Sequence, residues 1–357
     1  MKTFVLTDIP SPYQVEFFNE IESSGTQQLQ VGYLRRCDPD RRWRPSEIRH
    51  DAIELDQCDD ALRRARAAVE KADLVVFNYY SHPHAAELIG TRAKTGGPWC
   101  FWGERPGVRQ PAWAGRLLRK WKLAKLHESP VPIWGIGEFA VDGYRNEFGN
   151  ARSYFNLPYF SDLERFKVGP PMTRVNTERV FLFCGSLIER KGVDLLARAF
   201  VRVVREMGNV RLRIAGEGRL KESLARTLGP VQENVEFVGF KHWDELPELY
   251  AAADVLCVPS RYDGWGLVVP EALAAGLPVI ATDRMGAGLE FVRTGHNGWL
   301  IPAGEIEPII DAMRKAAALS DEELGQIAQQ ARRSVSEHTL AHGVERFARY
   351  AQAVLNV

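Results

Sequence analysis

The sequence predicts an α/β protein made of two doubly wound domains, and three observations support this prediction. Short β-rich apolar runs alternate with amphipathic segments, which is typical of parallel sheets covered by helices on both faces. The chain has 357 residues, more than a single hydrophobic core usually supports. The segment Lys167 to Glu178, KVGPPMTRVNTE, is polar and proline-rich and divides the alternation into two series. We therefore expect two Rossmann-like domains that face each other across a cleft.

The first series contains the strand patterns TFVL, LQVGYL, DLVVFNYY, PWCFW and SYFNLP. Helical patterns such as 61–71 and 83–94 lie between them. We assign residues 1–167 to an amino-terminal domain. The last helical pattern, 340–357, can complete this domain or pack on the other one.

The second series repeats the same alternation with the patterns ERVFLFCG, VRLRIAG, VEFVGF, DVLCVPS, PVIAT and GWLIP. An amphipathic helix, Val193 to Met207, follows the first of these strands. We assign residues 168–339 to a carboxy-terminal domain.

Composition excludes some classes of protein. Basic and acidic residues are equal in number, 46 of each, so bulk charge gives no attraction to nucleic acid. The five cysteines are odd in number and show no C-x-x-C spacing, which favours a reducing compartment. No apolar stretch approaches the ~20 residues of a spanning helix. We expect a cytoplasmic protein, with peripheral contact at the inner face of the plasma membrane left open.

Two carboxylates mark the loop after the strand DVLCVPS, which ends at Ser260. Ligands of open α/β sheets bind beyond the carboxyl ends of strands, so this loop borders the expected site. Pro270 is suited to be the first helical residue, which places Glu271 in the first helical turn. The helix start favours a phosphate, and Glu271 and Asp263 can accept hydrogen bonds from ligand hydroxyls. The alternative is that Glu271 complements the helix dipole and Asp263 supports a turn.

Two further loops follow strands of the same domain. In FCGSLIERKG a strand ends at Cys184, and the loop carries Gly185 and Ser186, then Arg190 and Lys191. Two adjacent cations at this edge suit a diphosphate, because Arg binds it bidentately and Lys adds a compact charge. A solvated pair is the alternative. In RIAGEGRL, two glycines follow a strand where a backbone can approach a ligand closely, or where the chain simply turns tightly.

Taken in order, these loops resemble the retaining glycosyltransferases of family four, the group 1 glycosyltransferases with the two-Rossmann GT-B fold. The matching positions are Gly185 to Gly192, Gly216 to Gly218, and Asp263 to Glu271 running into AAGLPV. Residues 156–305 of this sequence follow the family pattern well. The amino-terminal half is similar in pattern more than in letters.

The resemblance implies transfer of a sugar, with retention, from a nucleotide diphosphate sugar to a glycan, lipid-linked or small-molecule acceptor. Such a hexosyltransferase acts in surface polysaccharide or glycoconjugate biosynthesis. It implies catalytic roles for Arg190, Lys191 and Asp263, to which we add Glu104 as a candidate for orienting the sugar or the acceptor. It implies donor contacts for Gly185, Ser186, Gly216, Gly239, Leu267, Val268 and Glu271. We expect no cofactor beyond the nucleotide sugar, and no metal, because Lys and Arg can neutralise the diphosphate.

Two positions depart from the family pattern. Asp263 stands where the family has Glu, so its carboxylate reaches one methylene less far toward the sugar. Ser186 stands where many members carry Arg, so Arg190 must supply the guanidinium or Lys191 must carry the phosphates. These departures keep open a nucleotide-sugar-binding protein without transferase activity. A GT-B nucleotide-sugar epimerase is a second alternative, against which the Arg190–Lys191 loop argues.

Candidates on the acceptor side come from the amino-terminal domain. Pro12 and Tyr13 lie in the first loop, and His82 and His84 follow the strand DLVVFNYY. Capping or packing is the alternative role for the two histidines. Glu104 follows PWCFW, at a point where the family often carries a histidine, and a plain surface carboxylate is its alternative.

The segment 111–126, PAWAGRLLRKWKLAKL, contains leucines and tryptophans among five cations and no acid. A cationic amphipathic helix of this kind can lie in the interface of an anionic membrane. An ordinary surface helix that buries its apolar stripe is the alternative.

Overall fold

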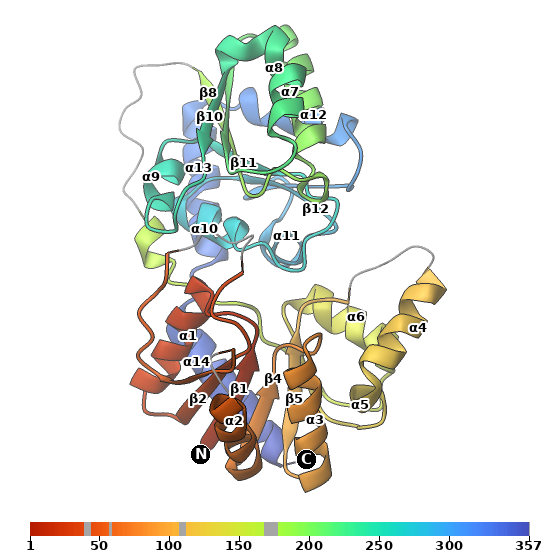
Figure 1. Cartoon of the computed structure of the whole chain (residues 1–357). Coiled ribbons are helices and arrows are strands. Elements are labelled where there is room, and N and C mark those ends of the chain that lie inside the picture. The colour runs from red at the N-terminus through yellow and green to blue at the C-terminus, as the bar shows by residue number, and fades with distance from the viewer. Residues whose placement is uncertain (39–43, 57–58, 107–111, 168–177, 357) are drawn as a thin grey trace. The chain divides into compact units, whose positions relative to one another are not determined.

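The computed structural model describes residues 1–356 except 39–43, 57–58, 107–111 and 168–177. The chain divides into two compact units, Met1–Asp162 with Thr339–Val357, and Leu163–His338. The last helix, α14 (Leu340–Leu355), belongs to the first unit (Figure 1). Residues 163–167, which we assigned by sequence to the amino-terminal domain, belong to the second unit. The reason is local packing, because the Phe166 ring meets the edge of Tyr250 with ring centroids 5.4 Å apart.

The first unit is built on one parallel sheet with the strand order β3-β2-β1-β4-β5-β6-β7 in the described residues. The strands are β1 (Lys2–Thr7), β2 (Gln28–Tyr33), β3 (Asp51–Glu54), β4 (Leu74–Phe77), β5 (Trp99–Gly103), β6 (Ile133–Gly135) and β7 (Tyr154–Asn156). The helices are α1 (Pro12–Ser23), α2 (Asp59–Lys71), α3 (Pro83–Thr95), α4 (Ala112–Lys122), α5 (Ala124–His127), α6 (Glu138–Phe148) and α14.

Alternate strand residues of this sheet pack into two different cores. Phe4 and Phe77 belong to the core that also takes in α2 and α3. On the opposite face, Trp102 packs on Phe17 of α1, and Trp134 packs on Phe347 of α14. This two-sided burial follows from the period of two along a strand and explains the continuous apolar runs in the sequence.

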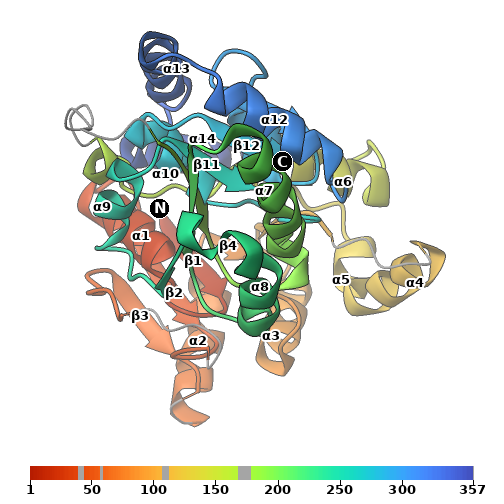
Figure 2. The ribbon, with the colours of Figure 1, turned by 90° about the horizontal axis from the view of Figure 1, so that it is seen from above.

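The second unit repeats the plan with the strand order β10-β9-β8-β11-β12-β13. The strands are β8 (Arg179–Cys184), β9 (Val210–Ala215), β10 (Val235–Gly239), β11 (Val255–Val258), β12 (Val279–Thr282) and β13 (Gly298–Ile301). The helical segments are η1 (Glu164–Phe166), η2 (Glu189–Lys191), α7 (Val193–Met207), α8 (Lys221–Leu228), η3 (Gly229–Asn234), α9 (Leu246–Ala251), α10 (Val268–Ala275), α11 (Gly286–Phe291), α12 (Glu307–Ala317) and α13 (Asp321–Ser334). Figure 2 shows the same elements from above.

Both sheets reverse their strand order at one point, between β1 and β4 in the first unit and between β8 and β11 in the second. This order is that of the doubly wound nucleotide-binding fold, in which ligands bind beyond the carboxyl ends of the strands at the reversal. The prediction of two parallel Rossmann-like sheets is therefore confirmed.

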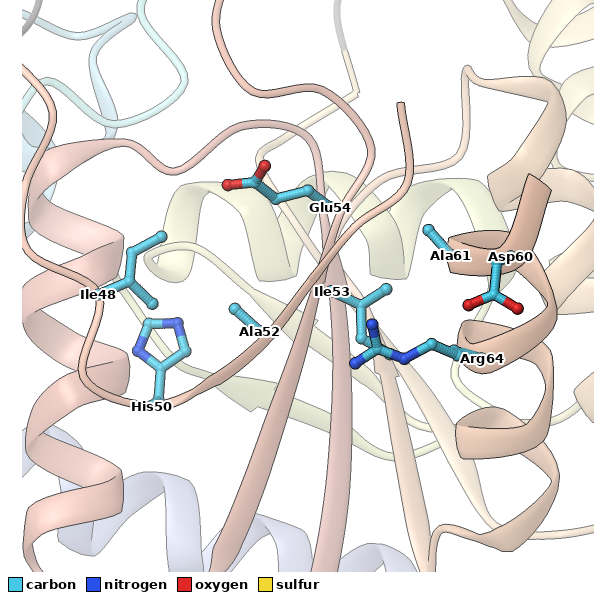
Figure 3. Close-up of a pocket in the computed structure, with 8 residues that line it drawn as sticks. All are labelled: Ile48, His50, Ala52, Ile53, Glu54, Asp60, Ala61 and Arg64. Carbon is cyan, nitrogen blue, oxygen red and sulfur yellow. The ribbon is translucent and has the colours of Figure 1, made fainter. Parts of the chain in front are cut away.

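A cavity of about 340 Å³ lies at the outer edge of the first sheet, beside β3. Figure 3 shows His50 on one side of it, and Asp60 and Arg64 of α2 on the other. The His50 ring is fully engaged, since Nδ1 donates to Asn19 Oδ1 over 2.8 Å and Nε2 accepts from the Tyr33 hydroxyl over 2.9 Å. Burial lowers the pKa of His50 to about 4, so the ring stays neutral. This histidine supports the core, far along the sheet from the strand reversal.

Candidate active site

The loops at the strand reversal of the second unit pack backbone against backbone. A Cβ added at Gly192 would lie 1.8 Å from the carbonyl oxygen of Pro259, and one at Gly216 would lie 1.9 Å from that of Gly185. The Arg261 amide also donates to the Arg190 carbonyl over 2.8 Å. For Gly216 the sequence left open either close approach of a ligand or a tight turn, and the structure shows that the neighbouring loops themselves require glycine at both positions.

The predicted cations and the predicted first acid meet in this site. Lys191 Nζ donates to Asp263 Oδ2, and Arg190 Nη1 lies 3.7 Å from Asp263 Oδ1. Arg190 also donates to the carbonyl of Tyr262 over 3.0 Å. Asp263 is buried, with 7% of its surface exposed. Two cations therefore share one carboxylate, which leaves the cluster with a net positive charge suited to an arriving diphosphate.

Arg261, which the sequence reading missed, holds this cluster in place. Its guanidinium binds both carboxylate oxygens of Asp194, over 2.6 and 2.8 Å, and it also donates to the carbonyl of Glu189. These bonds tie the loop after β11 to η2 and to the first turn of α7. In the sequence, the signal for a role of Arg261 is its position directly after the strand pattern DVLCVPS.

The helix that carries Glu271 begins earlier than the sequence indicated. We expected Pro270 to be the first helical residue, but α10 starts at Val268 with Leu267 as its N-cap. Proline is tolerated at this third position because the amides of the first turn have no acceptor within the helix. Leu267 and Val268 therefore stand at the helix start, where backbone amides favour an anion.

Glu271 is held by a tyrosine that the sequence reading did not select. The Tyr250 hydroxyl donates to Glu271 Oε2 over 2.9 Å. Tyr250 has 0% of its surface exposed and Glu271 has 8%. In the sequence, Tyr250 lies within the run LPELYAAADV and looks like an ordinary core residue.

The remaining predicted donor residues lie at the same edge of the sheet. Gly239 ends β10, and its carbonyl accepts from the Gly216 amide over 2.7 Å. Gly185 directly follows β8, and Ser186 after it is exposed. The structure thus gathers the predicted donor residues of the second unit around the ends of β8, β9, β10 and β11.

The first unit carries its own cavity, of about 360 Å³, at its strand reversal. Its lining includes Thr7 at the end of β1, Asn78 after β4 and Gly103 at the end of β5. The predicted residues Tyr13 and Glu104 line it.

The other predicted residues of the first unit occupy different places. Pro12 is the first residue of α1, and it does not line the cavity. His82 takes the capping role that the sequence left open, because its Nδ1 accepts from the His84 amide over 3.2 Å at the start of α3. Neither histidine lines the cavity.

Amides and hydroxyls form the floor of this cavity. Gln14 Nε2 and Thr7 Oγ1 both donate to Asn78 Oδ1, over 2.9 and 3.0 Å. Asn78 Nδ2 in turn donates to the carbonyl of Trp102 over 2.8 Å. Because these side chains bind one another and the backbone, their orientations in the floor are fixed by the protein itself.

Aromatic rings and acids form the walls of the same cavity. Tyr13 and Tyr159 pack with ring centroids 4.9 Å apart. Asp8 is bound bidentately by Arg35, over 2.9 and 2.6 Å. Aromatic faces with nearby hydroxyl, amide and carboxylate groups suit a hydroxylated ring such as a sugar.

Two further features of the described residues bear on the predictions about metals and membranes. No group of three or more His, Cys, Asp or Glu in that part of the chain is arranged to hold a metal ion. No helix formed by those residues is long and apolar enough to cross a membrane. The sequence prediction that no metal or cofactor is needed stays a prediction.

Two doubly wound units, each with side chains gathered at its strand reversal, define the GT-B class of fold. Solved structures agree with this assignment over the whole chain. The Anabaena protein HepE in complex with UDP superposes with a TM-score of 0.77, at 17% identity, over 99% of this chain and 100% of that one. Sucrose-phosphate synthase from Thermosynechococcus elongatus gives a TM-score of 0.74, at 17% identity, over 100% and 99% of the two chains.

Residues 178–318 match the family model described as glycosyl transferases group 1. An uncharacterized glycosyltransferase of Methanocaldococcus jannaschii is 40% identical over 129 residues, which are 35% of this chain and 32% of that protein. A GDP-mannose-dependent monoacylated alpha-(1-6)-phosphatidylinositol monomannoside mannosyltransferase of Corynebacterium glutamicum is 29% identical over 211 residues, 55% of this chain and 52% of that protein. The matched regions thus span about a third to half of these relatives' length. The match lies within the second unit and confirms the resemblance to the group 1 glycosyltransferases read from the motifs.

Proposed function

We propose that this chain is a retaining glycosyltransferase that moves a sugar from a nucleotide diphosphate sugar to a hydroxylated glycan, lipid-linked or small-molecule acceptor. The observation that carries the proposal is the cluster of Lys191, Arg190 and Asp263 at the strand reversal of the group 1 domain. It combines cations for a diphosphate with an acceptor for sugar hydroxyls. The relatives named as glycosyltransferases support the same class of reaction.

In the proposed reaction, the bond between the anomeric carbon and the β-phosphate oxygen breaks, and a bond forms from that carbon to an acceptor oxygen. Negative charge grows on the leaving diphosphate while the sugar becomes oxocarbenium-like. Lys191, Arg190 and the first amides of α10 stabilise that growing charge, and such preplaced donors contribute ~3 to 4 kcal/mol each in studied enzymes. The diphosphate leaves with the nucleoside and can take the proton of the acceptor hydroxyl.

The other side chains of the site would hold the substrates. Glu271 would accept hydrogen bonds from the ribose, and Asp263 from the transferred sugar once the diphosphate draws Lys191 away. The cavity of the first unit would hold the acceptor, with Tyr13 as an aromatic wall and Glu104 as an orienting carboxylate. No residue of the site needs a metal for these roles, because the two cations meet the charge of the diphosphate.

Turnover tests the proposal against the two alternatives. We expect free nucleoside diphosphate to appear only when donor and acceptor are both present. UDP-glucose and GDP-mannose are the first donors to try, because the names of similar proteins mention them. Tight binding without release would indicate a sugar-nucleotide-binding protein. A change of sugar identity with donor alone would indicate an epimerase.

We also propose that α4 contacts an anionic membrane, as a lipid-linked acceptor would require. Among the side chains of this helix that the structure describes, three large apolar ones are exposed, Leu117 by 61%, Leu118 by 46% and Trp121 by 77%. Arg119 is half-buried and pairs with the half-buried Glu147 over 2.9 Å, which fastens the helix to its unit. The exposed Lys120 lies beside the apolar side chains. Apolar groups with a neighbouring cation complement an anionic lipid surface. Figure 1 shows α4 at the edge of the first unit.

Sedimentation with vesicles tests this contact. Replacing Leu117 and Trp121 by serine is expected to weaken binding to phosphatidylglycerol-containing vesicles by at least about tenfold, because each side chain loses ~1.5 kcal/mol or more of apolar burial. Lys120→Glu is expected to weaken it as well, while Lys94→Glu, the same charge change on α3, is the control. Vesicles of phosphatidylcholine alone should bind poorly. Unchanged sedimentation of the serine variant would reject the contact.

A further inference from the structure

The hydroxyl of Tyr250 makes a contact that the proposed reaction has not yet used. It lies on α9, on a ring with 0% of its surface exposed, and it donates to Glu271 Oε2 over 2.9 Å. Glu271 lies in the first turn of α10 and is the carboxylate that the proposed function assigns to the ribose. Tyr250 therefore touches a binding group without lying at the surface itself.

The surroundings fix the orientation of this hydroxyl. The ring of Phe166 packs edge-on against Tyr250, with an interplanar angle of 79°. Burial raises the pKa of Tyr250 well above its usual range, and the charge of Glu271 raises it further. The hydroxyl consequently stays protonated and remains a donor at any physiological pH.

We propose that Tyr250 is a positioning residue, which holds the Glu271 carboxylate in the orientation that accepts hydrogen bonds from the ribose of a nucleoside diphosphate. This inference rests on the proposed function. A free glutamate side chain has several rotamers, and restricting it on binding costs ~1 to 2 kcal/mol. A buried tyrosine hydroxyl removes that cost beforehand, and a carboxylate can accept several hydrogen bonds, so the bond from Tyr250 is compatible with bonds from ribose hydroxyls.

Calorimetric titration with nucleoside diphosphates tests the inference without requiring catalysis. The probes are UDP and 2′,3′-dideoxy-UDP, with GDP and its dideoxy form used in the same way if the guanine nucleotide binds better. Tyr250→Phe is expected to weaken binding of the ribose nucleotide about tenfold, the usual effect of one lost bond to a charged group. Binding of the dideoxy nucleotide is expected to change less than about twofold, because it has no ribose hydroxyl for Glu271 to meet.

A double mutant and a matched control complete the experiment. Tyr250→Phe should add nothing in a Glu271→Gln background, because both changes remove the same ribose contact. Tyr33→Phe removes an equally buried hydroxyl bond in the first unit and should leave nucleotide affinity unchanged. If Tyr250→Phe does not fold, Glu271→Asp is the second variant, because it withdraws the carboxylate from the hydroxyl by one methylene. It should again weaken binding of the ribose nucleotide more than binding of the dideoxy nucleotide.

The outcomes separate this inference from the proposed function. Equal loss for both nucleotides, or no loss for either, would overturn the positioning role while leaving the transferase proposal intact. Failure of the wild-type chain to bind any nucleoside diphosphate would overturn both.

Discussion

Lys191→Ala is expected to lower kcat by about 10²- to 10³-fold while the Kd of the donor changes far less. The physical reason is that the ammonium group meets charge that develops on the leaving diphosphate and is smaller in the ground state. Lys191 is paired with Asp263, so part of its attraction for the donor is offset by the loss of that pair. Loss of the Lys191 ammonium group therefore changes donor affinity little and turnover strongly.

Pre-steady-state kinetics with a single donor measure this effect directly. Lys221→Ala is the matched control, because Lys221 forms an exposed pair with Glu217 on the neighbouring loop, and such pairs contribute little. Loss of donor binding with an unchanged kcat would contradict the role given to Lys191.

Gly192→Ala is expected to destabilise the second unit by about 3 to 5 kcal/mol. Gly192 has φ of +70°, and its new Cβ would lie 1.8 Å from the Pro259 carbonyl oxygen. The left-handed backbone alone costs an alanine ~1 kcal/mol or more. The clash adds to this, because backbone on both sides must move, and the loops that carry Lys191 and Ser260 would separate.

Gly208→Ala separates the two contributions. Gly208 has a similar φ of +73°, but nothing lies within 4 Å of the position of its Cβ. Gly208→Ala should therefore lower the free energy of unfolding only by the backbone strain, ~1 kcal/mol. Urea unfolding of both variants gives the comparison. Equal destabilisation would show that the loops do not depend on close backbone contact at Gly192.

Much of the fold followed from the sequence because buried parallel strands are continuous apolar runs. The run LVVF of β4 and the run VLCV of β11 are buried at every residue. The meeting of Lys191 with Asp263 was also predictable in outline. Both residues follow strands that pair in the sheet, β8 and β11, and parallel strands bring their carboxyl ends to one edge.

Other features of the site depend on packing that no local pattern records. Tyr250 reaches Glu271 from a different helix, and a tyrosine in an apolar run gives no sign of its partner. Gln14 of α1 and Asn78 of the loop after β4 meet in the floor of the first cavity, although they are far apart in the sequence. Gly192 stands in the sequence as the residue before a helical pattern, and the position of Pro259 in the structure shows what requires glycine there.

A crystal structure of the chain with a bound nucleoside diphosphate tests the central claim most directly. The account predicts diphosphate oxygens within hydrogen-bond distance of Lys191 Nζ, the guanidinium of Arg190 close by, and the ribose on Glu271. It also predicts that the bond between Lys191 and Asp263 is lengthened or broken. A nucleotide bound elsewhere, with that bond intact and Arg190 turned to solvent, would contradict it.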